Sequence, residues 1–371
     1  MSMRRRRLPL LLATLWAAAV TTPAAAAAPS DPAPVLPPTL VVSAHRGGSG
    51  YAPENTMTAY RNAVRIGADQ LETDTQLTSD GKLVLIHDAS LDRTTDCTGN
   101  VQDLTLVQVQ ACDAGYWWTP GQGTTVVDVT PPHPLRATGI HVPEAHELFD
   151  YVASLGGADT HSISIEIKDI PGEANFDPTG MHTAAVLVPL IKASGLKART
   201  TIVQSFYPPA LTYVRSLDPD IKTQLLTVGA ASPYLAYGVV GGEDIVSPDS
   251  TSPDLTTQFV TAAHTVGKQV IPYTPDTRAA LTSTGRKGVD GEITNFPACL
   301  LELEGRAHPV QLLPAASLAA GSGPVPTCAS EAPPTTAAMS EIGWPAALLP
   351  VGLIGGLAYV GRRRPATRAA R

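Results

Sequence analysis

Two histidines stand at the ends of short apolar runs in the N-terminal third of the sequence. His45 follows the run from Leu40 to Ala44, and His87 follows the run from Lys82 to Ile86. A lone histidine at such a position is more often structural than catalytic. A pair is suited to general acid–base chemistry, because near neutral pH one imidazole can accept a proton while the other donates one. We therefore interpret His45 and His87 as a candidate catalytic pair.

Three acidic residues occupy two strand-like segments in which polar and apolar residues alternate. Glu72 and Asp74 lie two residues apart, and Glu166 stands in Ser-Ile-Ser-Ile-Glu-Ile-Lys, which ends at Lys168. Alternation with period two places the polar members of each strand on one face. Converging carboxylates repel each other unless a cation lies among them, and their oxygens suit Ca²⁺ or Mg²⁺. The alternative is a set of solvated charges on an edge strand.

Two cations stand close to these residues. Arg46 directly follows His45, and Lys168 ends the strand that carries Glu166. A guanidinium can hold two phosphate oxygens at once, and an ammonium supplies a compact positive charge. Histidines, acids and cations together predict a phosphate-processing site.

Short β-branched runs alternate with helix-like stretches from residue 39 to about 305, and this pattern indicates the elements that position the site. The predicted strands are Leu40–Ala44, Gln70–Leu77, Lys82–His87, Ser162–Lys168, Thr201–Gln204, Lys222–Thr227, Asp244–Ser247, Gln269–Tyr273 and Gly291–Thr294. The predicted helices include Glu54–Ile66, Glu144–Leu155, Met181–Ala193, Pro209–Leu217 and Pro253–Val266. Such alternation is typical of a (β/α)₈ TIM barrel, although a doubly wound sheet gives the same pattern.

One stretch, about 89–141, interrupts the alternation and is too long for a simple connection, so we expect an inserted lobe. It contains Cys97 and Cys112, while Cys299 and Cys328 form a second near pair. An even number of cysteines in an exported chain predicts two disulfides. Three connectivities are possible, and nearness in sequence favours these two pairs.

The two ends of the chain predict export and membrane anchoring, with secretion as the alternative to anchoring. Residues 1–27 combine four arginines, an apolar run and a small-residue cleavage site, as in a signal peptide; an uncleaved anchor is the alternative. A linker, 28–38, precedes the folded part, and a Pro/Ala/Thr-rich stalk, 306–341, follows it. Residues 342–361 are long and apolar enough to span a bilayer, with a buried or peripheral hairpin as the alternative, and 362–371 form a basic tail that we expect in the cytoplasm.

The charge distribution excludes nucleic acid as a partner. Nine of the 26 basic residues lie at the two ends of the sequence. The part between these ends contains the other 17 basic residues and all 33 acidic residues, so its net charge is −16. Nucleic acid requires a basic surface.

The motifs together resemble the glycerophosphodiester phosphodiesterase family. The matching stretches are His45-Arg46-Gly47-Gly48, Pro53-Glu54-Asn55-Thr56, Glu72-x-Asp74, His87-Asp88, Glu166-x-Lys168, Gln204-Ser205-Phe206, Gly288-Val289-Asp290-Gly291 and Thr294-Asn295-Phe296-Pro297. The resemblance implies a closed barrel with a divalent metal on Glu72, Asp74 and Glu166. It also implies acid–base roles for His45 and His87, and phosphate contacts at Arg46 and Lys168.

Further site residues follow from the same resemblance. Gln204 and Tyr273 are expected to contact substrate, with Tyr273 at a place where the family often has tryptophan. Glu54 and Asn55 are expected to support the site, Glu54 by reaching the metal or by orienting His45.

The activity implied by the family is hydrolysis of a glycerophosphodiester to sn-glycerol 3-phosphate and an alcohol, with attack by the glycerol 2-hydroxyl through a cyclic phosphate. Teichoic-acid-like polymers are further candidate substrates for an enzyme anchored outside the cell. Two alternatives stay open from the sequence: a phospholipase D-like enzyme acting on lysophospholipid or sphingomyelin, and a non-catalytic, surface-anchored cell-wall-binding module.

Overall fold

The computed structural model describes residues 35–121, 133–156, 161–196, 201–231, 241–306 and 327–330. The predicted signal peptide, the predicted membrane-spanning segment 342–361 and most of the predicted stalk lie outside these ranges. Within the described residues, no helix combines the length and the hydropathy needed to cross a bilayer.

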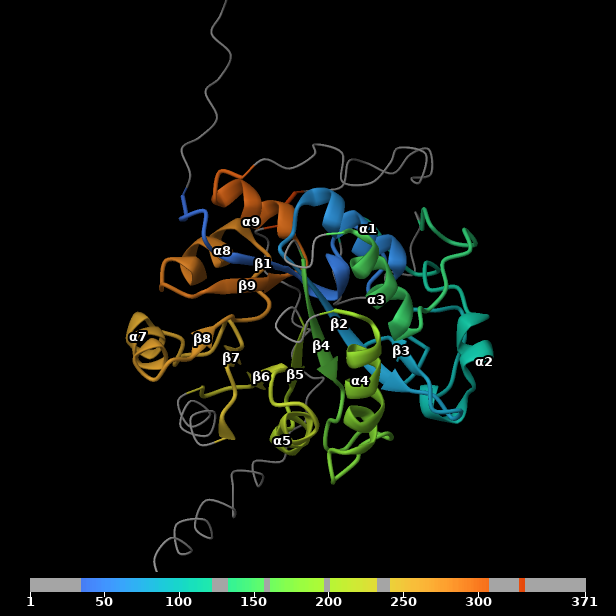
Figure 1. Ribbon diagram of the computed structural model, residues 1–371. Helices are drawn as coiled ribbons and strands as arrows, with labels where there is room; N and C mark the ends of the chain where they lie inside the picture. The colour runs from blue at the N-terminus through green and yellow to red at the C-terminus, as the bar shows by residue number, and fades with distance from the viewer. Residues whose placement is uncertain are drawn as a thin grey trace, which may run out of the picture. The chain divides into compact units, whose positions relative to one another are not determined.

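A parallel sheet forms the centre of the fold (Figure 1). Its strands run in the order β8-β7-β6-β5-β4-β2-β1-β9. Their bounds are β1 Val41–Ala44, β2 Gln70–Leu77, β4 Ser162–Ile167, β5 Thr201–Ser205, β6 Lys222–Thr227, β7 Ile245–Pro248, β8 Gln269–Val270 and β9 Gly291–Thr294. These bounds agree closely with the strands predicted from the sequence, except that β8 is shorter than the predicted strand Gln269–Tyr273.

The segment after β8 connects the two ends of this sheet. Tyr273 pairs in parallel with both Asp249 and Ile293, and the Ile293 amide donates a hydrogen bond of 2.9 Å to the Pro272 carbonyl. The strands therefore form a nearly closed parallel barrel of the (β/α)₈ type, which periodicity alone could not distinguish from a doubly wound sheet.

Helices flank the outside of the barrel (Figure 1). They are α1 Met57–Ile66, α3 Ala145–Ser154, α4 His182–Ala193, α5 Pro208–Leu217, α7 Thr257–Thr265, α8 Arg278–Gly285 and α9 Pro297–Leu303. Ile163, Ile165 and Ile167 of β4 share one buried cluster with leucines of the neighbouring helices. The alternating polar residues of β4 consequently face the barrel interior.

The barrel interior has an apolar layer and a polar layer. Ile202, Ile245, Ile271 and Ile293 form a buried cluster of their own. Since side chains alternate along a strand, Gln204 points the same way as Ile202 but lies one pleat nearer the carboxyl end of β5. The isoleucines thus fill the space beneath the polar residues at the rim, where barrel enzymes place their sites.

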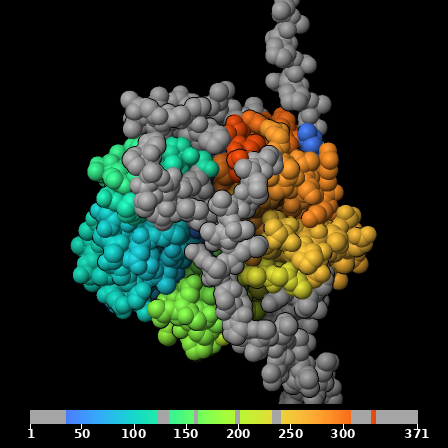
Figure 2. Space-filling model, turned by 180° about the vertical axis from the view of Figure 1, so that it is seen from behind, coloured from blue at the N-terminus to red at the C-terminus, as the bar shows by residue number. Residues whose placement is uncertain are grey.

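One predicted strand differs from the others. Residues Leu83–Leu85 form β3, which pairs antiparallel with β2 through Thr75 and Leu85 instead of joining the parallel barrel. It leads into a lobe that contains α2 (Leu106–Gln110) and a separate apolar core, with Leu91, Val101 and Val109 buried. The lobe, coloured cyan, lies at one side of the face shown in Figure 2.

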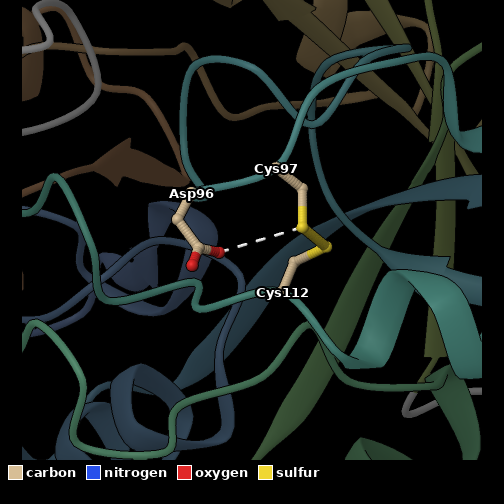
Figure 3. A group of neighbouring side chains, drawn as sticks. All are labelled: Asp96, Cys97 and Cys112. Atoms are coloured by element: carbon tan, nitrogen blue, oxygen red, sulfur yellow. Dashed lines mark hydrogen bonds between the residues drawn. A yellow bond between two sulfur atoms is a disulfide. The ribbon is translucent and has the colours of Figure 1, made fainter.

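A disulfide between Cys97 and Cys112, 15 residues apart in sequence, closes a loop of the lobe (Figure 3). Asp96 lies beside it, with its Oδ1 atom 3.8 Å from Cys97 Sγ and accepting a 2.7 Å hydrogen bond from the Asp113 amide. Both thiols are consumed in the disulfide, so these three residues do not offer the thiolate ligands of a metal site.

The second predicted disulfide, Cys299–Cys328, is also present, so the pairing favoured by nearness is confirmed. It holds residues 327–330 against the barrel. The Tyr51 hydroxyl donates a hydrogen bond to the Thr327 carbonyl at 2.5 Å, and the Ala329 amide donates one to the Asp276 carbonyl at 3.1 Å.

Candidate active site

Glu72, Asp74 and Glu166 converge inside the barrel, as the alternating pattern predicts. Asp74 pairs with Glu166 across β2 and β4, and oxygens of the three carboxylates lie within 4.8 Å of one another. All three side chains are buried. Burial and the neighbouring acids raise the pKa of Glu72 well above its usual range, and burial raises the pKa of Glu166 to about 8.

This donor set fits a hard divalent cation. Asp74 Oδ1 is buried without a hydrogen-bond partner among the described residues, and Lys168 Nζ lies 3.9 Å away from it. Buried carboxylates are ordinarily paired or coordinate a metal. Glu72, Asp74 and Glu166 are therefore the residues that would hold the predicted Ca²⁺ or Mg²⁺.

Arg46 enters the site through an unusual backbone turn. It lies in the short 3-10 segment His45–Gly47 with φ of 51°, and its amide donates a 2.7 Å hydrogen bond to Glu72 Oε2. Its Nε atom lies 3.3 Å from Asp74 Oδ2. Gly47 permits the turn, because a Cβ there would lie 2.6 Å from the Cβ of Ala59 and the glycine φ is +82°.

His45 is held in one tautomer by a chain of hydrogen bonds. Its Nδ1 lies 2.7 Å from Asn295 Oδ1, which can only accept, so Nδ1 carries the proton. The Asn295 side-chain amide in turn donates to Asp276 Oδ2 at 2.6 Å. His45 Nε2 lies 4.0 Å from Glu72 Oε2, and burial together with Arg46 lowers the pKa of His45 to about 3. The imidazole is therefore neutral, with an unprotonated Nε2 facing the carboxylates.

His87 is oriented in the same manner from the other side. Its Nδ1 lies 2.6 Å from Asp88 Oδ1, and its Nε2 accepts a 2.9 Å hydrogen bond from Lys168 Nζ. Burial, with the positive charges of Arg46 and Lys168, lowers the pKa of His87 to about 4. Lys168 also lies 3.0 Å from Glu166 Oε1, as expected for two side chains on one face of a strand.

The two supporting residues have different partners. Asn55, at φ of 55°, donates to Asp74 Oδ2 at 2.8 Å and accepts from the Asp74 amide at 3.2 Å, which fixes this carboxylate. The structure places Glu54 against Arg46, at 2.9 Å, and against Arg93, at 2.7 Å. Glu54 therefore contacts two guanidinium groups, whereas the sequence led us to expect contact with the metal or with His45.

The other two predicted substrate residues also have protein partners. Gln204 donates to Glu72 Oε1 at 2.7 Å and accepts from Gln224 at 2.9 Å, so it holds a carboxylate of the acidic cluster. The Tyr273 hydroxyl donates to the Thr227 carbonyl at 3.0 Å, and its ring packs edge-on against Phe206 with centroids 5.7 Å apart.

Sequence reasoning gave no role to four residues that hold the histidines and arginines in place: Asp88, Arg93, Asp276 and Asn295. Asp88 and Asn295 stand in motifs already noted, but the partner of Asn295 lies 250 residues away. Arg93 carried no signal beyond its position five residues after Asp88. Local spacing does not reveal contacts of this range.

The fold and the rim residues define a TIM-barrel protein with an acidic cluster that could hold a metal ion, flanked by two neutral histidines. The family model described as "Glycerophosphoryl diester phosphodiesterase family" matches residues 45–299. The chain belongs to this family. A glycerophosphodiester phosphodiesterase of Bacillus subtilis is 31% identical over 281 residues, covering 70% of this chain and 85% of the relative. One of Caldanaerobacter subterraneus is 31% identical over 274 residues, covering 71% and 97%.

Solved structures share the fold. A phosphodiesterase of Oleispira antarctica, in complex with the product sn-glycerol-3-phosphate, superposes with a TM-score of 0.59 at 23% identity, covering 70% of this chain and 95% of the other. A glycerophosphodiester phosphodiesterase of Agrobacterium tumefaciens gives 0.53 at 24% identity, covering 70% and 97%. At these identities the likeness establishes the barrel fold.

Proposed function

We propose that this protein is a divalent-metal-dependent phosphodiesterase that hydrolyses glycerophosphodiesters to sn-glycerol 3-phosphate and an alcohol. The observation that carries the proposal is the convergence of His45 and His87, each held with Nδ1 protonated, on the buried cluster of Glu72, Asp74 and Glu166. The named activity of the two relatives that are 31% identical supports the same substrate class.

Binding of the phosphodiester anion falls to two cations. Arg46 and Lys168 are both buried, and the neighbouring carboxylates raise the pKa of each despite burial, so both stay charged. A divalent ion on the acidic cluster would supply Lewis-acid stabilisation of the charge that develops on the phosphoryl oxygens. Fixed positive groups in a dry site act on that charge more strongly than they would in water.

We assign proton transfer to the Nε2 atoms of the two histidines, because Nδ1 of each already carries a proton. His45 Nε2 is unprotonated and takes the proton of the attacking glycerol 2-hydroxyl, whose oxygen forms a bond to phosphorus as the bond to the leaving alkoxide breaks. His87 Nε2 must give a proton to that alkoxide. His87 therefore takes up a proton from water before this step, and the Asp88 carboxylate at its Nδ1 together with the bound phosphate anion favours the protonated imidazole. Water then opens the cyclic phosphate, with the two roles reversed.

Neither of the two other functions open from the sequence is favoured. The family match and the complete set of site side chains argue against a non-catalytic module. A phospholipase D-like activity would require intact lipids to react faster than water-soluble diesters.

One activity panel tests the proposal. Glycerophosphocholine, glycerophosphoethanolamine, glycerophosphoinositol and a polyglycerophosphate are each assayed with Ca²⁺ and with Mg²⁺. We expect release of sn-glycerol 3-phosphate that stops in EDTA and returns with one of the two ions. Near-native turnover by His45→Ala or His87→Ala, or activity that persists in EDTA, would refute the mechanism.

We further propose that the protein is exported and anchored, with its catalytic domain outside the cell and polyglycerophosphate of the teichoic-acid type among its substrates. The two disulfides support export, since disulfides form in oxidising compartments. Export predicts a mature N-terminus near Ala28, and anchoring predicts recovery in the membrane fraction. Recovery of the full chain in the cytoplasmic fraction would contradict both.

A further inference from the structure

Arg93 belongs to the inserted lobe and not to the barrel. The turn that carries it is fixed by lobe contacts: Thr95 donates two hydrogen bonds to the Leu91 carbonyl, and the Trp117 indole donates one of 2.8 Å to the Thr95 carbonyl. Leu91 is buried in the core of the lobe, and Cys97 of the disulfide follows shortly after. The backbone position of Arg93 therefore depends on the fold of the lobe.

The Arg93 side chain reaches from the lobe to two carboxylates. Its Nε and Nη2 donate to the two oxygens of Asp88 at 2.7 and 2.9 Å. Its Nη1 and Nη2 donate to the two oxygens of Glu54 at 2.8 and 2.7 Å. The guanidinium is thus bidentate to both acids, the geometry in which such pairs are strongest, and its side chain is only 19% exposed.

Each of these carboxylates holds a residue of the catalytic site. Asp88 Oδ1 lies 2.6 Å from His87 Nδ1, and Glu54 Oε1 accepts a 2.9 Å hydrogen bond from Arg46 Nη1. The order of groups is consequently Arg46, Glu54, Arg93, Asp88 and His87. This chain of alternating charges joins the phosphate-binding residue after β1 to the acid–base residue after β3.

Removal of Arg93 would affect both ends of this chain. Asp88, with a side chain 27% exposed, would lose both hydrogen bonds from Arg93 and keep the one with His87, so it could turn toward solvent. His87 would then lose the acceptor that fixes its tautomer. Glu54 would keep Arg46 as its partner, and the stronger pairing would leave less of the Arg46 charge for a phosphate.

We propose that Arg93 is a positioning residue through which the lobe fixes the tautomer and orientation of His87 and the availability of Arg46. The inference rests on the proposed function, since it assigns Arg93 to the proton transfer and the phosphate binding of that reaction. It also gives the lobe a role in turnover.

The test compares Arg93→Ala, Arg93→Lys and a control in the full chain. Arg136→Ala is the control, because Arg136 is a lobe arginine that stacks on Tyr116 at 4.0 Å. With glycerophosphocholine we expect kcat to fall about 10- to 100-fold in Arg93→Ala, the loss typical when a group that orients a metal-binding histidine is removed. Arg93→Lys should fall in between, since an ammonium cannot form two bidentate pairs. Arg136→Ala should stay within about twofold of wild type.

Chemical rescue separates positioning from a loss of folding. Millimolar guanidinium chloride should restore a substantial part of kcat in Arg93→Ala, because the free ion can occupy the space between Asp88 and Glu54, and should leave wild type unchanged. A kcat of Arg93→Ala within twofold of wild type would overturn the inference. The inference would also be overturned if guanidinium did not restore kcat in Arg93→Ala and the loss of activity matched the loss of folded protein.

A second measurement distinguishes failure of this inference from failure of the proposed function. Nitrogen-15 NMR of the imidazoles, assigned with His87→Gln, reports which nitrogen of His87 is protonated without any substrate. The Nδ1–H form should dominate in wild type and lose its preference in Arg93→Ala. If wild type hydrolyses no glycerophosphodiester, the function fails and the imidazole spectra alone decide the inference: an unchanged His87 tautomer in Arg93→Ala would overturn it.

Discussion

Asn295→Ala tests how far the orientation of His45 depends on one hydrogen bond. Asn295 Oδ1 is the acceptor for His45 Nδ1, at 2.7 Å, and its backbone and side-chain amides both donate to Asp276, at 2.8 and 2.6 Å. Alanine removes the acceptor but keeps the backbone bond to Asp276. The imidazole would then be free to rotate or to place its proton on Nε2, the nitrogen that must accept one.

The size of the effect follows from the burial of the group. Leaving a buried donor without its partner costs about 1–3 kcal/mol. If that cost falls on the productive orientation of His45, kcat should drop roughly 5- to 150-fold, since about 1.4 kcal/mol corresponds to a factor of ten. KM should change little, because Arg46 and Lys168 keep their contacts.

The assay is steady-state release of sn-glycerol 3-phosphate from glycerophosphocholine at a saturating concentration of the activating metal ion. Asn100→Ala is a matched control, the same substitution at an exposed asparagine that bonds to Asp103 in the lobe. Thermal melts establish that both variants are folded. A kcat within twofold of wild type for a folded Asn295→Ala would refute the assignment of His45 as the oriented base.

Three further predictions concern stability. Glu292 is fully buried, and neither of its oxygens has a partner among the described residues. Burial and then Glu304 raise its pKa well above the usual range. Stability should therefore fall as pH rises above about 4.5, where the unfolded carboxyl ionises, and urea melts of Glu292→Gln should show a shallower fall than wild type. An equal slope in the variant would contradict this. Gly47→Ala should lower Tm more than Gly81→Ala, because both glycines have positive φ but only Gly47 would bring a Cβ against Ala59; equal losses would show that the contact does not matter. The double variant Cys97→Ala/Cys112→Ala should lose about 3 kcal/mol of unfolding free energy in urea, as expected for a 15-residue loop, and a loss under 1 kcal/mol would contradict the estimate.

The barrel could be predicted because its strands carry an unusually clear alternation. In β4 the isoleucines pack outward and Glu166 faces inward, so one local pattern indicates both the element and the direction of its functional side chain. The acidic cluster follows from two such strands. Closure depends on Tyr273 pairing with residues on both sides, and the sequence indicated it only through the family resemblance.

The groups that orient the catalytic residues were harder to predict, for a physical reason. His45 and Asn295 are distant in the chain and meet because β1 and β9 are neighbours in the barrel. Arg93 lies in the lobe, whose fold has no periodic pattern to read. The roles of such residues depend on tertiary packing, and a hydrogen bond formed that way leaves no local spacing in the sequence.

The acidity of the chain is also better understood from the structure than from its net charge. In the buried site, the carboxylates of Glu72, Asp74 and Glu166 outnumber the cations Arg46 and Lys168, while the histidines are neutral. Without a further cation, burial and then the neighbouring carboxylates raise the pKa values of Glu72 and Glu166, which favours their neutral, protonated forms. A divalent ion among these oxygens would instead keep the three carboxylates ionised and, with Arg46 and Lys168, would leave the site with a net positive charge. The charge balance of the site and its set of donor oxygens thus both fit a bound divalent cation.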